Sequence, residues 1–437
     1  MNATRMFRWA ALAAAVVPAA VACSEGSDES TPELSSQPDA APSTPIPMSD
    51  AAVSLDDAGS DASIDADADV DAAKPMRTCT DEGWCHVDVP DGQTLRNLWK
   101  DASGVVWTVS EKGNVLRWDG TAWVQSFAAG VPLYAIWGSS PTDIWVGGGP
   151  TSPTNAVVPG VLYHGTGTSP ATLEWTQVAA PLTIRSLWGT SATDVWATAS
   201  MPQRVSASDP SYILHYVGPD GLPGDGDAGD AGDAAAIGTG WLVDSASTAF
   251  KAHFEKIWGT GTGDIWVSAR GAVNSYTQAG QVIHRRPDGA GGYAWSTAQP
   301  TTTDKPRNDT FGLSFSRESV FIVNFTTNSS GYAYYHQGVS TDDGATFAWT
   351  QHAAAETGFA DRSLSVVGGT GPNDLWAAGP LGRLRHWDGT AWHVARAAVD
   401  DVTPVQQTVY DILASGPDDV WVVGANLALH KTAPSNP

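Results

Sequence analysis

The stretch that most constrains the fold is LWGTSATDVWA, residues 187–197, because close copies of it recur along most of the chain. Similar sequences recur at 136–146 and 257–267, and in a weaker form at 366–377 and 412–422. In a repeat of this kind each copy is one packing unit that must bury its face against its neighbours. The repeat therefore predicts an architecture far more firmly than it predicts a chemistry.

Each copy divides into four short apolar segments, which we interpret as four β-strands joined by turns rich in Gly, Ser and Asp. An aromatic residue marks the second strand of every copy and counts seven copies: Trp107, Trp145, Trp196, Trp266, Phe321, Trp376 and Trp421. The first strand is marked by Trp99, Trp137, Trp188, Trp258, Phe315, Val367 and Leu413. The degenerate copies are the last three.

The fourth strand carries a Trp in only six places after the first copy begins: Trp123, Trp175, Trp241, Trp295, Trp349 and Trp392. The missing strand has its counterpart near the N-terminus, where residues 83–90 around Trp84 share the sequence pattern of the fourth strand. An N-terminal strand that completes the last blade leaves no open edge in a ring of sheets. We therefore predict an all-β fold, a seven-bladed β-propeller of four-stranded antiparallel blades, with the last blade closed by the strand near Trp84.

The charge of the chain and its lack of known cofactor motifs limit the partners that it can bind. The chain has 23 Lys+Arg against 47 Asp+Glu and a formal net charge of -24, whereas a nucleic-acid partner calls for clustered cations. No P-loop, zinc motif, dinucleotide fingerprint or nucleophile elbow is present. We expect no nucleic-acid partner, no cofactor and no metal.

The first 22 residues have the pattern of an export signal, in which Arg5 and Arg8 precede the apolar run 9–22. The run ends in AVAC, and Cys23 in this setting resembles the lipobox cysteine of bacterial lipoproteins. The resemblance implies a diacylglyceryl group on the Cys23 thiol, and the absence of Asp after it implies the outer membrane. We expect an exported protein at the outer membrane or cell surface that contacts the membrane through this anchor only; simple secretion is the alternative.

Three regions follow from these patterns. Residues 1–22 are the predicted lipoprotein signal peptide, 23–76 a disordered acidic tether of Ser, Pro, Ala and Asp, and 77–437 the propeller. The aspartates of the tether lack the Gly turn and closing Glu of an EF-hand loop. The two remaining cysteines, Cys79 and Cys85, form an even pair in an oxidising compartment, which predicts a disulfide.

Residues 340–347, STDDGATF, match the pattern S-x-D-x-G-x-T-W/F, and 118–123 and 387–392 are shorter relatives of the same turn. The pattern resembles the Asp-box, or bacterial neuraminidase repeat, propellers, which include sialidases and many exported proteins without enzymatic activity. The resemblance implies a folding element in which Asp342 caps a hairpin and Gly344 takes the tight turn. Sialidases have six blades and an N-terminal Arg motif, and this chain has neither.

Two sets of polar residues recur in equivalent places. Aspartates precede the second strand (Asp143, Asp194, Asp264, Asp374 and Asp419), and histidines occupy the third (His164, His215, His284, His336, His386 and His430). Equivalent positions in separate blades lie far apart, so neither set converges on one site. We interpret the aspartates as Asx-type caps that accept backbone N–H groups, and the histidines as structural donors to turns.

A binding site is better sought where the first strands begin, at the mouth of the central channel. Three residues before the marker of each first strand stand Arg96, Tyr134, Arg185, Glu255, Gly312, Leu364 and Tyr410, which differ from copy to copy while the rest repeats. Positions released from a common packing role are the expected members of a ligand-binding ring. Long loops at 147–160, 198–210 and 269–280 rim the same face. The alternative is a solvated channel mouth.

The polar members of this ring, Arg96, Tyr134, Arg185, Glu255 and Tyr410, are the predicted ligand-binding residues. We expect a monomeric, non-catalytic binding module at the cell envelope, with an envelope protein or a glycan as its ligand. A glycan-active hydrolase or lyase on a propeller scaffold is the alternative. Convergence of the ring residues in one pocket favours the enzyme, because catalysis needs acid and base groups within reach of one bound atom.

Overall fold

The computed structural model describes residues 79–151, 157–201, 209–221, 236–238, 240–250, 252–270, 281–298, 300, 305–326, 333–353, 364–395, 397 and 405–433. All of them belong to one compact unit, Ala72–Pro437. The predicted signal peptide, Cys23 and the tether lie outside the described residues, as does most of the Gly and Asp-rich insertion after residue 218.

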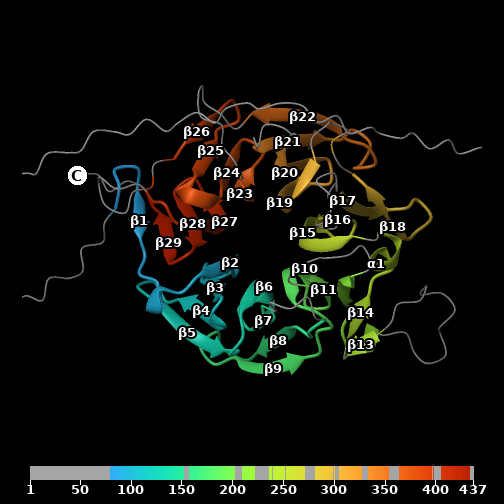
Figure 1. Cartoon of the computed structure of the whole chain (residues 1–437), viewed down its shortest axis with the longest axis horizontal. Helices are drawn as coiled ribbons and strands as arrows, with labels where there is room; N and C mark the ends of the chain where they lie inside the picture. The colour runs from blue at the N-terminus through green and yellow to red at the C-terminus, as the bar shows by residue number, and fades with distance from the viewer. Residues whose placement is uncertain are drawn as a thin grey trace, which may run out of the picture. The chain divides into compact units, whose positions relative to one another are not determined.

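Seven antiparallel sheets form a ring, which confirms the predicted all-β propeller (Figure 1). Blade one consists of β2 (Leu95–Lys100), β3 (Val106–Ser110), β4 (Asn114–Trp118) and β5 (Trp123–Ala128). Blade two consists of β6 (Leu133–Ser140), β7 (Asp143–Gly148), β8 (Val161–Thr166) and β9 (Glu174–Val178). Blade three consists of β10 (Ile184–Ser191), β11 (Asp194–Ser200), β12 (Ser211–Tyr216), β14 (Trp241–Val243) and β13 (Ala236–Gly238), so this blade has a fifth, outermost strand.

Blade four consists of β15 (His253–Gly261), β16 (Asp264–Arg270), β17 (Gln281–Pro287) and β18 (Tyr293–Thr297). Blade five consists of β19 (Lys305–Ser316), β20 (Ser319–Thr326), β21 (Ala333–Val339) and β22 (Ala348–Ala353). Blade six consists of β23 (Val366–Gly371), β24 (Asp374–Ala378), β25 (Leu384–Trp387) and β26 (Trp392–Val394). Blade seven consists of β27 (Val409–Gly416), β28 (Asp419–Gly424), β29 (Leu427–Lys431) and β1 (Trp84–His86).

Helical turns are few among the described residues: α1 (Ala246–Ala249), η1 (Pro90–Gly92), η2 (Pro219–Gly221) and η3 (Pro380–Gly382). The innermost strand of each blade contacts that of the next, and β27 contacts β2, which closes the ring. The core is divided into clusters, several of which take residues from two successive blades. Each blade therefore depends on its neighbours for burial.

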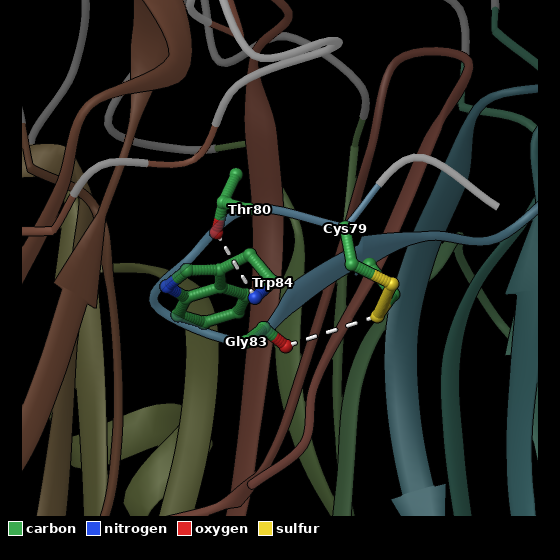
Figure 2. Close-up of a disulfide and its surroundings, with 5 residues drawn as sticks. Cys79, Thr80, Gly83 and Trp84 are labelled. Atoms are coloured by element: carbon green, nitrogen blue, oxygen red, sulfur yellow. Dashed lines mark hydrogen bonds between the residues drawn. A yellow bond between two sulfur atoms is a disulfide. The ribbon is translucent and has the colours of Figure 1, made fainter. Parts of the chain in front are cut away.

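The last blade closes as predicted. Strand β1 pairs with β29, and Trp84 lies opposite Lys431. The Trp84 indole is buried and meets Trp376 of blade six edge-on, at 5.4 Å between ring centroids. A disulfide joins Cys79 to Cys85 of this strand. The backbone N–H of Trp84 donates to the Thr80 hydroxyl at 3.2 Å (Figure 2). The disulfide ties the residues before β1 to the closing strand.

The Trp-Gly pair in the repeated stretch has a direct packing reason. A Cβ at Gly138 would lie 2.6 Å from Cη2 of Trp99, and one at Gly189 would lie 2.9 Å from Cη2 of Trp137. Such separations are shorter than real Cβ contacts, so only glycine accommodates the indole of the preceding blade. The repeated dipeptide is thus a blade-to-blade contact, with the Trp of one copy lying on the Gly of the next.

The repeated aspartates and histidines form one network within a blade. In blade three, Trp196 and Asp194 share a sheet face because they are two residues apart. His215 lies opposite Trp196 and stacks on it at 3.8 Å between ring centroids, while its Nε2 lies 2.7 Å from Asp194 Oδ1. Thr190 and Thr262 donate to the other oxygen of Asp194. Burial opposes ionisation, but these hydrogen bonds hold the pKa of Asp194 below its ordinary value.

The same His–Asp contact occurs in blades two, four, six and seven. The predicted structural role of these histidines agrees with it, but both predicted partners were wrong. The aspartates bind side chains instead of backbone N–H groups, and the histidines bind aspartates instead of turns. The reason is the antiparallel register, which places the His beside the Trp and diagonal to the Asp.

The turn at 340–347 has the geometry expected for its residues. Asp342 accepts hydrogen bonds from the Thr346 backbone N–H at 2.8 Å and the Thr346 hydroxyl at 2.6 Å, which lower its pKa to about 2. Gly344 has a φ of 78°, a conformation that favours glycine. Phe347 packs against Trp266 of blade four, at 5.1 Å between ring centroids. The turn therefore fastens blade five to blade four.

Candidate functional site at the channel mouth

The five predicted ring residues occupy one structural position. In each, the inner strand has a β-bulge: Leu95 pairs with Ser110 and Asn97 with Val109, which leaves Arg96 as the extra residue. Tyr134, Arg185, Glu255 and Tyr410 are the extra residues of their own strands in the same way. A bulge re-aims a side chain and frees it from the regular alternation of the sheet. These positions hold Arg, Tyr or Glu instead of one repeated residue, because no common sheet contact constrains them.

All five side chains line one cavity of about 570 Å³. The cavity is completed by Glu111, Pro150, Thr151, Thr183, Lys256, Ser365, Val366, Pro380 and Thr408. A second cavity of about 310 Å³ shares Lys256 and Val366 with the first and is lined by Trp99, Trp137, Trp188 and Trp258, among others. The channel thus has a polar mouth that passes into an aromatic and aliphatic interior.

In blades five and six the ring position is held by other residues than the sequence predicted. Opposite the second-strand markers Phe321 and Trp376 stand Leu313 and Gly368, not Phe315 and Val367. The prediction for Gly312 and Leu364 was therefore wrong, because the position opposite the marker is held by Leu313 and Gly368 instead of the aromatic residue found in blades one to four. The equivalent residues are Thr310, which is buried, and Ser365, which lines the mouth.

Arg96 organises one side of the mouth. Its Nε donates to Glu111 Oε1 at 2.8 Å, and its guanidinium carbon lies 3.8 Å from the centroid of the Tyr410 ring. The same carbon is 5.7 Å from the centroid of Tyr134. Burial raises the pKa of the Tyr134 hydroxyl, so this group stays a neutral donor and acceptor at physiological pH.

Arg185 and Glu255 form the other side. Arg185 donates from Nη2 to the Met201 carbonyl at 2.7 Å and from Nε to Ser200 Oγ at 3.2 Å. Buried His253 links the two residues, since its Nδ1 lies 2.8 Å from Glu255 Oε1 and its Nε2 lies 2.8 Å from the same Met201 carbonyl. A carbonyl oxygen only accepts, so both bonds require either a doubly protonated His253 or a protonated Glu255.

Lys256 and Asp411 stand one residue deeper, directly after the bulge. Lys256 lines both cavities, with its Nζ 5.7 Å from the centroid of Phe311. Burial lowers the pKa of Lys256, against the attraction of Asp411 and Glu255. Burial likewise raises the pKa of Asp411, which accepts hydrogen bonds from the Leu98 backbone N–H at 2.7 Å and from Asn97 Nδ2 at 2.6 Å.

Glu111 and Lys256 were missed from the sequence. Glu111 lies in the turn after β3, where nothing in the repeat marks it. Lys256 stands one position after Glu255, whereas the ring was predicted only from residues three positions before each first-strand marker. In the described residues no group of three or more His, Cys, Asp or Glu side chains is placed to hold a metal ion, and no helix is long and apolar enough to cross a membrane.

No protein-family model matches the chain. Tectonin-1 of Physarum polycephalum is 35% identical over 77 residues, which make up 17% of this chain and 31% of Tectonin-1. The match thus spans about a third of that protein.

Among solved structures, YCF48 bound to D1 peptide is 14% identical, with a TM-score of 0.51 over 80% of this chain and 97% of YCF48. YCF48 from Cyanidioschyzon merolae is 14% identical, with a TM-score of 0.53 over 80% of this chain and 99% of that protein. These similarities establish the propeller fold shared by the three chains.

Proposed function

We propose that this chain is a non-catalytic binding module that holds a segment of a protein ligand at the mouth of its central channel. One observation carries the proposal: five bulge residues of three types, two Arg, two Tyr and one Glu, line a single cavity. A packing role would have kept them alike, as it kept the Trp-Gly pairs alike. Tyr and Arg are also the side chains that most often dominate protein interfaces.

A peptide ligand suits this mouth better than a glycan. Sugar rings commonly stack on open aromatic faces, but Arg96 covers the face of Tyr410 at 3.8 Å and lies within cation–π distance of Tyr134. The mouth instead offers charges of both signs and carbonyl and hydroxyl groups, which suit the amides and charged side chains of a peptide. YCF48, which has the same fold, is a protein bound to a peptide.

An array of peptides and glycans probed with the full chain tests the proposal. The Arg185→Ala, Glu255→Ala double variant is expected to lose at least about tenfold in affinity for the peptides that wild type retains. The matched control is Lys431→Ala, Asp418→Ala, which removes an ion pair of 2.6 Å outside the cavity and is expected to bind as wild type does. Equal binding by wild type and the ring variant would rule out the mouth as the site. Retention of glycans alone would replace the peptide with a sugar.

We further propose that the mature protein is exported and anchored through Cys23 at the outer membrane or cell surface, where it acts as a monomer on an envelope partner. The support is the export pattern of residues 1–22 and the AVAC run that ends in Cys23. Metabolic labelling with radioactive palmitate is expected to mark wild type and to be absent from Cys23→Ser. Equal labelling of both proteins would refute the anchor.

A glycan-active enzyme is the second candidate, and the convergence of the ring is the observation that favours it. Glu111, Glu255 and Tyr410 line one cavity, as acid, base and nucleophile groups must. Against it, Glu111 is already bound by Arg96 and Glu255 by His253, so neither carboxyl group is held free to act on a substrate. Product formation from an envelope polysaccharide by wild type, lost in both Glu111→Gln and Glu255→Gln, would establish the enzyme and displace the binding module.

A further inference from the structure

We propose that Lys256 receives a carboxylate of the bound peptide at the floor of the mouth. The inference rests on the proposed function, because it names the chemical group that the same site recognises. It concerns a residue one position beyond the predicted ring.

The position of Lys256 is the first reason. In blades one, three and seven the residue directly after the bulge accepts a hydrogen bond from the inner strand of the next blade, whereas blade two has Ala135 there, which is small and apolar. Asn97 Oδ1 accepts from the Ile136 N–H at 2.9 Å, and Asp411 Oδ2 accepts from the Leu98 N–H at 2.7 Å. Ser186 Oγ does the same for the Ile257 N–H at 3.3 Å. An ammonium group has no acceptor, so Lys256 does not perform this packing role.

The contacts of Lys256 are the second reason. Within the described residues its Nζ makes no hydrogen bond and no ion pair within 4.0 Å, and its near neighbour is the ring of Phe311. The two nearest carboxylates are already engaged: Asp411 by Leu98 and Asn97, and Glu255 by His253. A half-buried cation without a contact of opposite charge is costly, and a bound anion offsets that cost.

The accessibility of Lys256 is the third reason. It belongs to the lining of both cavities, so a group that enters through the mouth reaches its Nζ before the tryptophan-lined interior. The chain carries a net charge of -24, which disfavours a polyanion at long range. A single carboxylate, at a peptide C-terminus or on an Asp or Glu side chain, fits a single ammonium on the floor of a small cavity.

The experiment uses the full chain and peptides selected on the array, each made in three forms. One form has its natural carboxylates, one has an amidated C-terminus, and one has Asp and Glu replaced by Asn and Gln. Affinities are measured by isothermal titration calorimetry for wild type, Lys256→Met and Lys256→Arg. Lys112→Met is the matched control, because Lys112 is exposed and lies outside both cavities.

Lys256→Met is expected to weaken binding of the natural form at least about tenfold, while Lys256→Arg stays within about threefold of wild type and Lys112→Met is unchanged. One of the two neutralised peptide forms is expected to bind wild type as weakly as Lys256→Met does, and that form identifies the C-terminal or side-chain carboxylate. Thermal melting of Lys256→Met and Lys256→Arg confirms that both fold.

Two results overturn the inference. If Lys256→Met weakens all three peptide forms equally, or none of them, Lys256 does not recognise a carboxylate, although binding that is still lost in Arg185→Ala, Glu255→Ala keeps the proposed function. If wild type binds none of the peptides, both proposals fail together.

Discussion

Blades four and five are neighbours with the same four strands, yet they are held together by different contacts. In blade four, Asp264 accepts hydrogen bonds from Thr260 at 2.6 Å and from the Trp266 indole at 2.9 Å, and lies 2.8 Å from His284 Nε2. In blade five, Ser319 and Phe321 stand where Asp264 and Trp266 stand. The fold therefore does not require the network in every blade.

The two blades also differ in register. His284 lies opposite Trp266 and stacks on it at 4.0 Å, whereas Gln337 lies opposite Phe321 and His336 lies opposite Ile322. A shift of one residue moves a side chain to the other face of its sheet. The prediction that His336 is equivalent to His284 was therefore wrong.

Blade five instead contributes a turn to blade four. Phe347 lies 5.1 Å from the Trp266 ring and 5.8 Å from the His284 ring, and it closes over the network. As a result Asp264 is 2% exposed and His284 is fully buried. A blade that has lost its own network thus completes the burial of its neighbour's.

The largest expected effect follows from removing the aspartate in each blade. Asp264→Ala leaves the Thr260, Trp266 and His284 donors buried without their acceptor, at a cost of about 4 kcal/mol in the free energy of unfolding. Ser319→Ala at the equivalent position is expected to cost less than about 1 kcal/mol. Urea denaturation of the two variants and wild type gives both values. Equal losses would show that the network contributes nothing beyond the fold it belongs to.

The next effect is a pH dependence that arises from His336 in blade five. Burial, with a smaller contribution from the neighbouring His352, lowers the pKa of His336 to about 4, below its ordinary value of 6.5. As the pH falls from about 6.5 to about 4, the unfolded chain takes up a proton that the folded chain does not. Stability is therefore lost over that range, by about 3 kcal/mol in total.

His336→Leu is expected to remove this contribution. As the pH falls, the unfolding free energy of wild type therefore decreases more steeply than that of the variant. Denaturation at several pH values between about 7 and about 4 measures it. Val339→Ala, which removes no titratable group from an exposed position on the same strand, is the control and should leave the slope unchanged. A slope that is the same for wild type and His336→Leu would contradict the assigned cause.

The two blades show why part of the structure was predictable from the sequence. Blade number, strand order and the closing strand followed from aromatic residues that recur in one register, because the same stacking contact fixes that register in blades two, three, four, six and seven. The ring at the mouth followed from the one position where that contact is absent. In blade five the marker at Phe321 survived, but the first and third strands carried no residue that fixed their register, so Gly312 and His336 were each misplaced.

The remaining errors have a spatial cause. Glu111 and Lys256 reach the mouth from a turn and from the position after a bulge, and neither carries a periodic pattern. Their convergence with Arg96 and Glu255 is a property of the closed ring, in which residues more than a hundred positions apart face one cavity. A pattern along the chain identifies which positions are free to vary, but it does not identify which of them meet.

The smallest effect is a test of whether register alone separates the two blades. Ser319→Asp places a carboxylate on the same face of the sheet as Phe321, whereas His336 lies on the opposite face of the sheet. The carboxylate gains no imidazole partner, so we expect a loss of about 1 kcal/mol in the free energy of unfolding. Adding Gln337→His supplies an imidazole opposite Phe321, as His284 lies opposite Trp266, and is expected to recover about 1 kcal/mol relative to Ser319→Asp alone. Ser319→Asn with Gln337→His is the control for a pair without the carboxylate charge and should recover less. If Ser319→Asp alone stabilises the chain, His336 reaches that face after all and the register explanation fails.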